Sequence, residues 1–183
     1  MNTMRPALAA IVTALALLTA SGCAVVSDQQ GVGSYFDDTG TTTKVKAKLA
    51  EDPAVKSSAI SVETLKGTVQ LAGFVKTDAE KATAERVVRA VPGVVTLRND
   101  LVVVSNQQST GSYIDDTGIT TKVKAKLAEE PSLKSGAIAV ETLRGTVQLS
   151  GFIKTATEKS TAERVARGVS GVTALRNDLI VMP

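Results

Sequence analysis

The stretch TVQLAGF at residues 68–74 recurs as TVQLSGF at residues 146–152, an offset of 78 residues (68 to 146). The match continues on both sides without a gap, beginning at Gly33 and Gly111 in the two copies. Repetition at a fixed spacing indicates a duplicated structural unit. The sequence therefore predicts two copies of one small domain, which account for nearly all of the chain beyond residue 32.

The repeated stretch alternates apolar and polar residues, and so does AISVETL at residues 59–65 just before it. Such alternation is typical of half-buried strands. Only Lys66 and Gly67 separate the two runs, which is the length of a tight hairpin loop. The predicted partners are Thr64 with Val69, Val62 with Leu71 and Ile60 with Gly73. This pairing puts the apolar residues on one face, where Gly73 is expected to leave room for a helix.

Helical patterns flank the hairpin. Thr42, Val45 and Leu49 share one face of a helix predicted over residues 41–50. Either Asp38 or Thr39 is placed to cap its start.

After the hairpin, Thr77 and Glu80 form a capping box for a second helix that ends near Ala90. An alternating closing strand follows at residues 94–104. The predicted fold is α+β, with two tandem αββαβ domains that each pack a three-stranded sheet against two helices.

The N-terminal segment has the features of an export signal. Arg5 supplies a positive charge, and residues 7–20 form a nearly unbroken apolar run, shorter than the roughly 20 residues of a membrane span. Small residues then lead to Cys23, and this arrangement resembles the lipobox of bacterial lipoproteins. The resemblance implies cleavage before Cys23 and acylation of its thiol. The alternative is an ordinary signal peptide cleaved near Gly22.

These boundaries predict five parts. They are a lipoprotein signal peptide at 1–22, a tether at 23–32, a first domain at 33–104, a linker at 105–110 and a second domain at 111–183. The linker is short enough that the domains should touch or nearly touch. Ala24 and Val25 follow the cysteine, where inner-membrane lipoproteins commonly carry Asp. The lipobox resemblance thus implies an outer-membrane anchor, with the protein facing the periplasm.

Composition excludes most catalytic chemistry. The chain has no His and one Cys, which removes internal disulfides, His or multi-Cys metal sites and imidazole-based catalysis. Asp37 and Asp38 could suggest a cation site, but they lack further ligands, and capping explains them better. A net charge of +3, spread evenly over both copies, argues against a nucleic-acid partner. No cofactor, no metal and no enzymatic activity are expected.

Both copies resemble the BON domain, named for bacterial osmotically inducible and nodulation-associated proteins. The resemblance rests on TTKVKAKLA, VETLKGTVQLAGFV, AEKATAERVVRAV and PGVVTLRNDLVV in the first copy and on their counterparts in the second. It implies an αββαβ fold without enzymatic chemistry, binding to phospholipid membranes, and maintenance of the cell envelope under stress.

Basic residues on the predicted helices are the candidate lipid-binding residues. Lysines beside an apolar stripe can bury their stems and present ammonium groups to lipid phosphates, although a solvated helix face is the alternative for any one of them. The candidates are Lys44, Lys46, Lys48, Lys122, Lys124, Lys126, Arg164 and Arg167, with the second domain preferred. The predicted partner is an anionic phospholipid membrane. The alternative function is a periplasmic interaction or chaperone-like stress factor that binds outer-membrane or periplasmic proteins.

Overall fold

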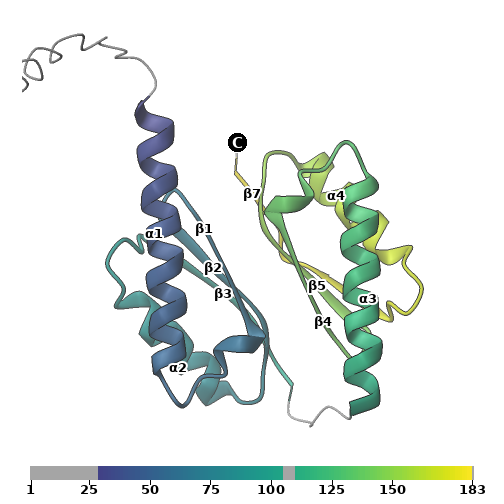
Figure 1. Ribbon diagram of the computed structural model, residues 1–183, viewed down its shortest axis with the longest axis horizontal. Coiled ribbons are helices and arrows are strands. Elements are labelled where there is room, and N and C mark those ends of the chain that lie inside the picture. Colours follow the sequence, from purple (N-terminus) through teal and green to yellow (C-terminus); the bar gives the residue numbers. More distant parts are fainter. Residues whose placement is uncertain (1–28, 105–109, 183) are drawn as a thin grey trace, which may run out of the picture.

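The computed structural model describes residues 29–104 and 110–182, which form two α+β domains of the same architecture (Figure 1). The first domain contains α1 (Gln29–Glu51), β1 (Ile60–Leu65), β2 (Thr68–Val75), α2 (Asp78–Arg89) and β3 (Thr96–Val103). The second contains α3 (Thr110–Glu129), β4 (Ile138–Leu143), β5 (Thr146–Ile153), α4 (Ala156–Arg167), β6 (Ala174–Asn177) and β7 (Ile180–Val181). The predicted αββαβ order is confirmed. The predicted signal peptide, Cys23 and most of the tether and linker lie outside the described residues.

The hairpin has the predicted register, with Thr64 opposite Val69 and Val62 opposite Leu71. Lys66 and Gly67 at its tip have φ angles of 51° and 72°. Two positive φ angles give the turn a twist that matches the flanking strands. β3 then pairs with β2 in parallel, so β2 is the central strand. In the second domain β6 and β7 share the place of β3 beside β5.

One face of each sheet packs against its two helices. Val45 and Leu49 of α1 are buried as predicted, and they meet Leu71 from β2 and Val88 from α2 in one core cluster. The second domain repeats this cluster with equivalent residues. Because the apolar faces of both helices reach the same side of the sheet, the opposite side is left for another contact.

α1 is longer than predicted, and Asp38 does not cap it. The helix begins at Gln29, inside the segment assigned to the tether, so both proposed caps, Asp38 and Thr39, lie within it. The Asp38 carboxylate accepts hydrogen bonds from the backbone N–H groups of Lys66 (2.7 Å) and Gly67 (2.9 Å). The capping prediction was wrong because the partners of this carboxylate lie in the hairpin tip. Asp116 binds the second hairpin tip in the same way.

Gly73 is required by a neighbouring backbone. Its φ angle is 124°, and a Cβ atom at this position would collide with the carbonyl oxygen of Ala59. Ala59 ends a short 3-10 helix (Ser57–Ala59) that leads into β1, so the element that approaches Gly73 is this helical turn and not one of the two helices packed on the sheet. Gly151 has the same relation to Ala137.

Thr77 caps α2 as predicted, and its Oγ1 accepts a hydrogen bond from the Glu80 N–H (3.0 Å). The Glu80 carboxylate has different partners from those of a standard capping box. It accepts bonds from the backbone N–H groups of Lys76 (2.9 Å) and Lys56 (2.8 Å). Glu80 thereby ties the start of α2 to the loop that follows α1.

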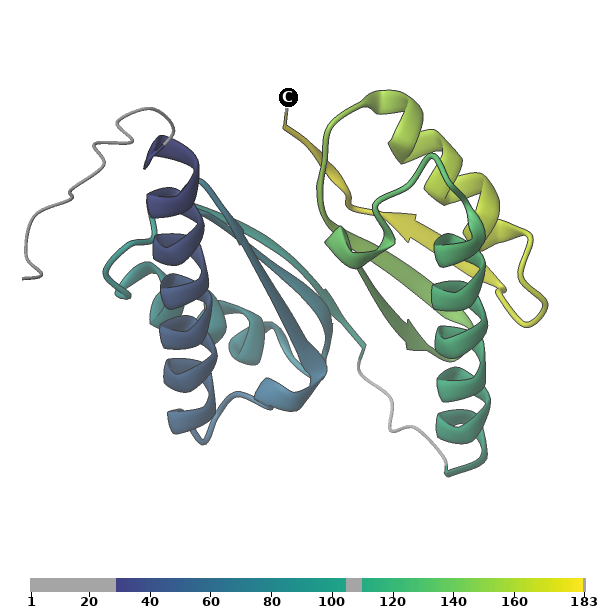
Figure 2. The ribbon, with the colours of Figure 1, turned by 45° about the horizontal axis from the view of Figure 1, so that its top comes forward.

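The two sheets pack face to face, so the molecule has four layers in the order helices, sheet, sheet, helices (Figure 2). Gln70 and Ala72 point away from their own helices, yet both are buried, as are Gln148 and Ser150. The two domains are therefore in direct contact, through the sheet faces that the helices leave open.

Two glutamines hold this interface by equivalent hydrogen bonds. Gln70 Oε1 accepts a bond from the Gly151 N–H (2.8 Å), and Gln70 Nε2 donates to the Asp178 carbonyl (2.7 Å) and to Asp100 Oδ2 (2.8 Å). Gln148 Oε1 accepts a bond from the Gly73 N–H (2.9 Å), and Gln148 Nε2 donates to the Asp100 carbonyl (2.8 Å) and to Asp178 Oδ2 (2.7 Å). The domains are thus related by an approximate two-fold axis, and α1 and α3 run in opposite directions in Figure 1.

Candidate functional site

The second domain has a groove between α3 and α4, which we call the α3/α4 groove. Its volume is about 600 Å³. Lys122, Lys126 and Arg164 contribute basic side chains, and Val165 and Val169 contribute apolar surface. Three of the predicted lipid-binding residues therefore meet at one place, although they come from two helices.

The first domain has a smaller version, the α1/α2 groove, with a volume of about 300 Å³. Lys44 and Lys48 line it together with Val87 and Val91. Every residue that lines this groove has its counterpart, 78 residues further along, in the α3/α4 groove. The two grooves are therefore the same structural feature in two copies.

Each groove holds one paired and one unpaired lysine. Lys126 Nζ lies 2.7 Å from Glu129 Oε2, and Lys48 Nζ lies 2.7 Å from Glu51 Oε2. Lys44 and Lys122 take part in no ion pair within the described part of the chain. Because exposed ion pairs contribute little, a bound anion can compete for the paired lysines as well.

Arg164 is a further basic group in the α3/α4 groove. Its Nη2 lies 3.6 Å from Glu130 Oε2, and both residues line the groove. At this distance the contact is a loose ion pair without a hydrogen bond. The guanidinium group can therefore turn towards a phosphate or carboxylate in the groove.

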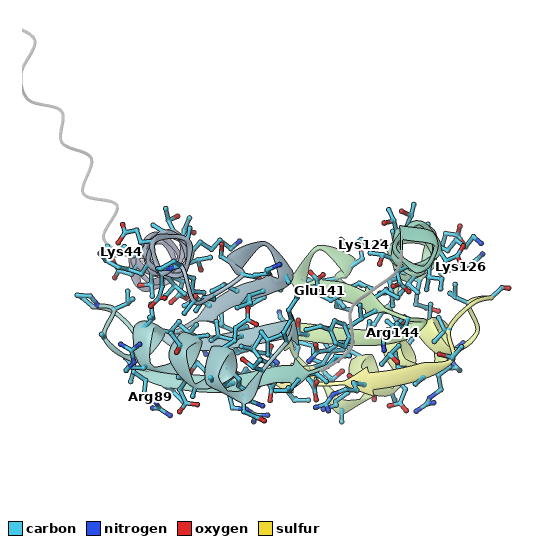
Figure 3. All side chains as sticks on the ribbon, turned by 90° about the horizontal axis from the view of Figure 1, so that it is seen from below. Lys44, Arg89, Lys124, Lys126, Glu141 and Arg144 are labelled. Atoms are coloured by element: carbon cyan, nitrogen blue, oxygen red, sulfur yellow. The ribbon has the colours of Figure 1, made fainter. Side chains whose placement is uncertain are left out.

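The other candidates lie elsewhere. Figure 3 shows Lys124 and Lys126 on opposite sides of α3. Lys46 lines a separate small hollow with Leu49. Arg167 Nη2 bonds Glu163 Oε1 at 2.9 Å and does not line the α3/α4 groove. The fold thus brings only some of the predicted lipid-binding residues into the grooves.

Sequence reasoning missed the apolar wall of the grooves. Val165 and Val169 line the α3/α4 groove, as Val87 and Val91 line its counterpart. The available signal was a pair of valines four residues apart, which occurs at the same place in both copies. It points to one shared surface at the C-terminal end of α2 and of α4, the second and shorter helix of each domain.

Two carboxylates lie on the sheet faces that meet between the domains. Glu63 pairs with Gln70 and Glu141 with Gln148, so both acids share the face of the glutamines. Burial raises the pKa of Glu63 and of Glu141, and the nearby charge of Lys46 or Lys124 works against this rise. Figure 3 shows Glu141 between the two domains.

Within residues 29–104 and 110–182, no group of three or more acidic, His or Cys side chains could hold a metal ion. Nor does any helix there combine the length and apolar character needed to cross a membrane.

Together, these features define a class of protein with tandem αββαβ domains, each bearing a helix–helix groove with an apolar wall and basic residues. The chain belongs to the BON domain family, which matches residues 37–105 and 115–183.

The chain is similar to three characterised relatives. It is 38% identical to the osmotically-inducible protein Y of Escherichia coli (strain K12), over 87% of this chain and 80% of that protein. It is 30% identical to a 21 kDa hemolysin of Actinobacillus pleuropneumoniae, over 79% of this chain and 74% of the hemolysin. A third match, to the outer membrane lipoprotein DolP of Haemophilus influenzae, has 32% identity over 44% of this chain and 42% of DolP.

Proposed function

We propose that this chain is a non-enzymatic envelope protein that binds anionic phospholipid membranes and supports outer-membrane integrity under osmotic stress. The observation that carries this proposal is the α3/α4 groove, which combines Lys122, Lys126 and Arg164 with an apolar wall. Family membership and the similarity to an osmotically inducible protein and to an outer membrane lipoprotein support it.

The groove suits a phospholipid because it offers both kinds of contact that such a molecule needs. Lys122 and Lys126 can lay their stems along α3 and present ammonium groups to headgroup phosphates. Half-buried Val165 and exposed Ala125 can receive the glycerol and upper acyl region, above the core residue Val169. Each basic residue near an anionic surface contributes about 1 kcal/mol, so the three groups together give useful but reversible binding.

An acyl anchor at Cys23 is part of the proposal. Two or more acyl chains hold a protein stably at a bilayer. A tethered groove then meets the membrane at high effective concentration, so that modest affinity is sufficient. In this arrangement the protein is attached to the outer membrane and faces the periplasm.

The test is co-sedimentation of residues 24–183, which lack the anchor but contain every described residue. Vesicles of phosphatidylglycerol mixed with phosphatidylcholine are compared with phosphatidylcholine alone, at low and high salt. We expect binding to the anionic vesicles only, and loss of binding at high salt because screening weakens exposed charges. Lys122→Ala with Lys126→Ala should weaken binding by about thirtyfold, or about 2 kcal/mol.

The matched control is Lys124→Ala, which removes the same charge from the same helix outside the groove. It should have a clearly smaller effect than either groove lysine changed alone. An equal effect of Lys124→Ala would mean that binding depends on the general surface charge and not on the groove. Absence of binding to both kinds of vesicle would reject the lipid function and favour the alternative, a factor that binds envelope proteins.

A further inference from the structure

The two grooves open on opposite sides of the molecule. α1 and α2 form one outer layer and α3 and α4 form the other, with both sheets between them (Figures 1 and 2). Figure 3 gives the same arrangement from a third direction, with α1 and α3 at the two sides. A flat surface that contacts one groove therefore cannot reach the other.

This opposition is fixed by the interface between the sheets. Gln70 and Gln148 are each about 1% exposed and bond backbone groups of the other domain. Turning both helical layers towards one plane would break these bonds and uncover the buried faces. Leaving buried polar groups without partners is costly, so the opposed arrangement is the stable one.

The smaller groove is also suited to an anionic surface. Lys44 and Lys48 have the same places as Lys122 and Lys126. Glu51 pairs with Lys48 at this groove as Glu129 pairs with Lys126 at the larger one. The smaller groove has no counterpart of Arg164 among its lining residues, so it offers one basic group fewer.

We propose that this protein bridges two anionic phospholipid surfaces, with one groove on each. The inference rests on the proposed function, because it assumes that the α3/α4 groove binds lipid. It adds that the α1/α2 groove is a second and weaker membrane site that faces the other way. A single chain can then hold two bilayers together.

The experiment mixes residues 24–183 with two populations of phosphatidylglycerol and phosphatidylcholine vesicles that carry donor and acceptor fluorescent lipids. Energy transfer and light scattering report clustering, and co-sedimentation on the same samples reports binding. The wild-type chain should cluster the vesicles at low salt and release them at high salt. Lys44→Ala with Lys48→Ala should abolish clustering while the bound fraction falls by no more than about twofold, since the stronger site remains.

Lys46→Ala with Lys124→Ala is the matched control. It also removes two lysines from the first helices of the domains, but neither residue lines a groove. This variant should cluster vesicles as the wild type does. Undiminished clustering by the Lys44 and Lys48 variant would overturn the inference, since a self-associating chain could then bridge through one groove.

The two proposals fail differently. Binding without clustering by the wild-type chain would overturn bridging and leave the lipid-binding function standing. Absence of binding would overturn both.

Discussion

Glu63 and Glu141 show how a single side chain links protonation to folding. Both acids lie on the sheet faces that the domains bury against each other. Burial raises the pKa of each in the folded chain. The folded state therefore binds more protons than the unfolded state, and the contribution of these groups to the free energy of unfolding falls as pH rises through the folded pKa.

Glu63→Gln with Glu141→Gln should consequently raise the free energy of unfolding at neutral pH. The gain should shrink as pH falls and should vanish below the ordinary glutamate value of 4.5, since the wild-type acids are then neutral in both states. Urea unfolding of both proteins at several pH values measures this difference. A gain that stays constant with pH would show that the amides act by packing and not by removing a charge.

Glu85 and Glu163 serve as a control because their pKa is shifted in the opposite direction. A hydrogen bond from Asn99 or Asn177 is the main cause that lowers the pKa of these two half-buried acids, and a hydrogen bond from Arg89 or Arg167 lowers it further. Their contribution to stability is present above the unfolded pKa and is lost as pH falls through the folded pKa. Glu85→Gln with Glu163→Gln should therefore lower stability at neutral pH, and this loss should shrink in acid.

Asp38 acts at the scale of elements, because it joins α1 to the hairpin. Asp38→Ala removes the charged acceptor of the Lys66 and Gly67 N–H groups. We expect a loss of about 1.5–3 kcal/mol in the free energy of unfolding, the range for bonds to charged groups. Urea unfolding gives this value, and amide exchange at Lys66 and Gly67 should quicken.

The neighbouring Asp37 is the control for this prediction. It lies on the same helix but is exposed, so Asp37→Ala should change stability by no more than about 0.5 kcal/mol. Equal losses in the two variants would indicate a general effect of helix charge in place of the contact with the hairpin.

Local sequence signals predicted those elements whose determinants are close together in the chain. Lys66 and Gly67 fixed the hairpin register, and Thr77 fixed the start of α2, because a turn or a cap depends on a few adjacent residues. The beginning of α1 was not predictable in this way. Asp38 is attractive as a cap in sequence, but its partners are 28 and 29 residues away.

The contact between the two domains uses a sheet face that the alternating sequence pattern alone would assign to solvent. Gln70 and Ala72 occupy the positions between the core residues of β2, and period-two patterning assigns such positions to the surface. The face lacks charge along the central strand, where Gln, Ala and Phe74 alternate with the core. Together with the short linker, this pattern indicated that the domains touch, but it did not specify which faces meet. The grooves could not be predicted from the sequence either, because each is formed by residues from two helices.

Gln70→Ala and Gln148→Ala test the coupling of the domains. Each change leaves a glycine N–H and a backbone carbonyl of the other domain without a partner. We expect each to lower the free energy of unfolding by about 1–3 kcal/mol. If the glutamines hold one common interface, the double variant should lose less than the sum of the single losses.

Thr157→Ala, at an exposed position on α4, should stay within about 0.5 kcal/mol in the same urea titration. Strict additivity of the glutamine changes would mean that the two contacts act independently and that the sheets do not separate as a unit.

The reciprocal bonds of Gln70 and Gln148 also bear on the ancestry of the chain. One copy of the repeat already carries both halves of the contact, since the glutamine and the glycine N–H that it binds occur together in every copy. A single repeat with these residues has the self-complementary surface that a symmetric dimer requires. Duplication and fusion of such a repeat would replace a concentration-dependent assembly by a permanent one and would leave each half free to diverge around its own groove.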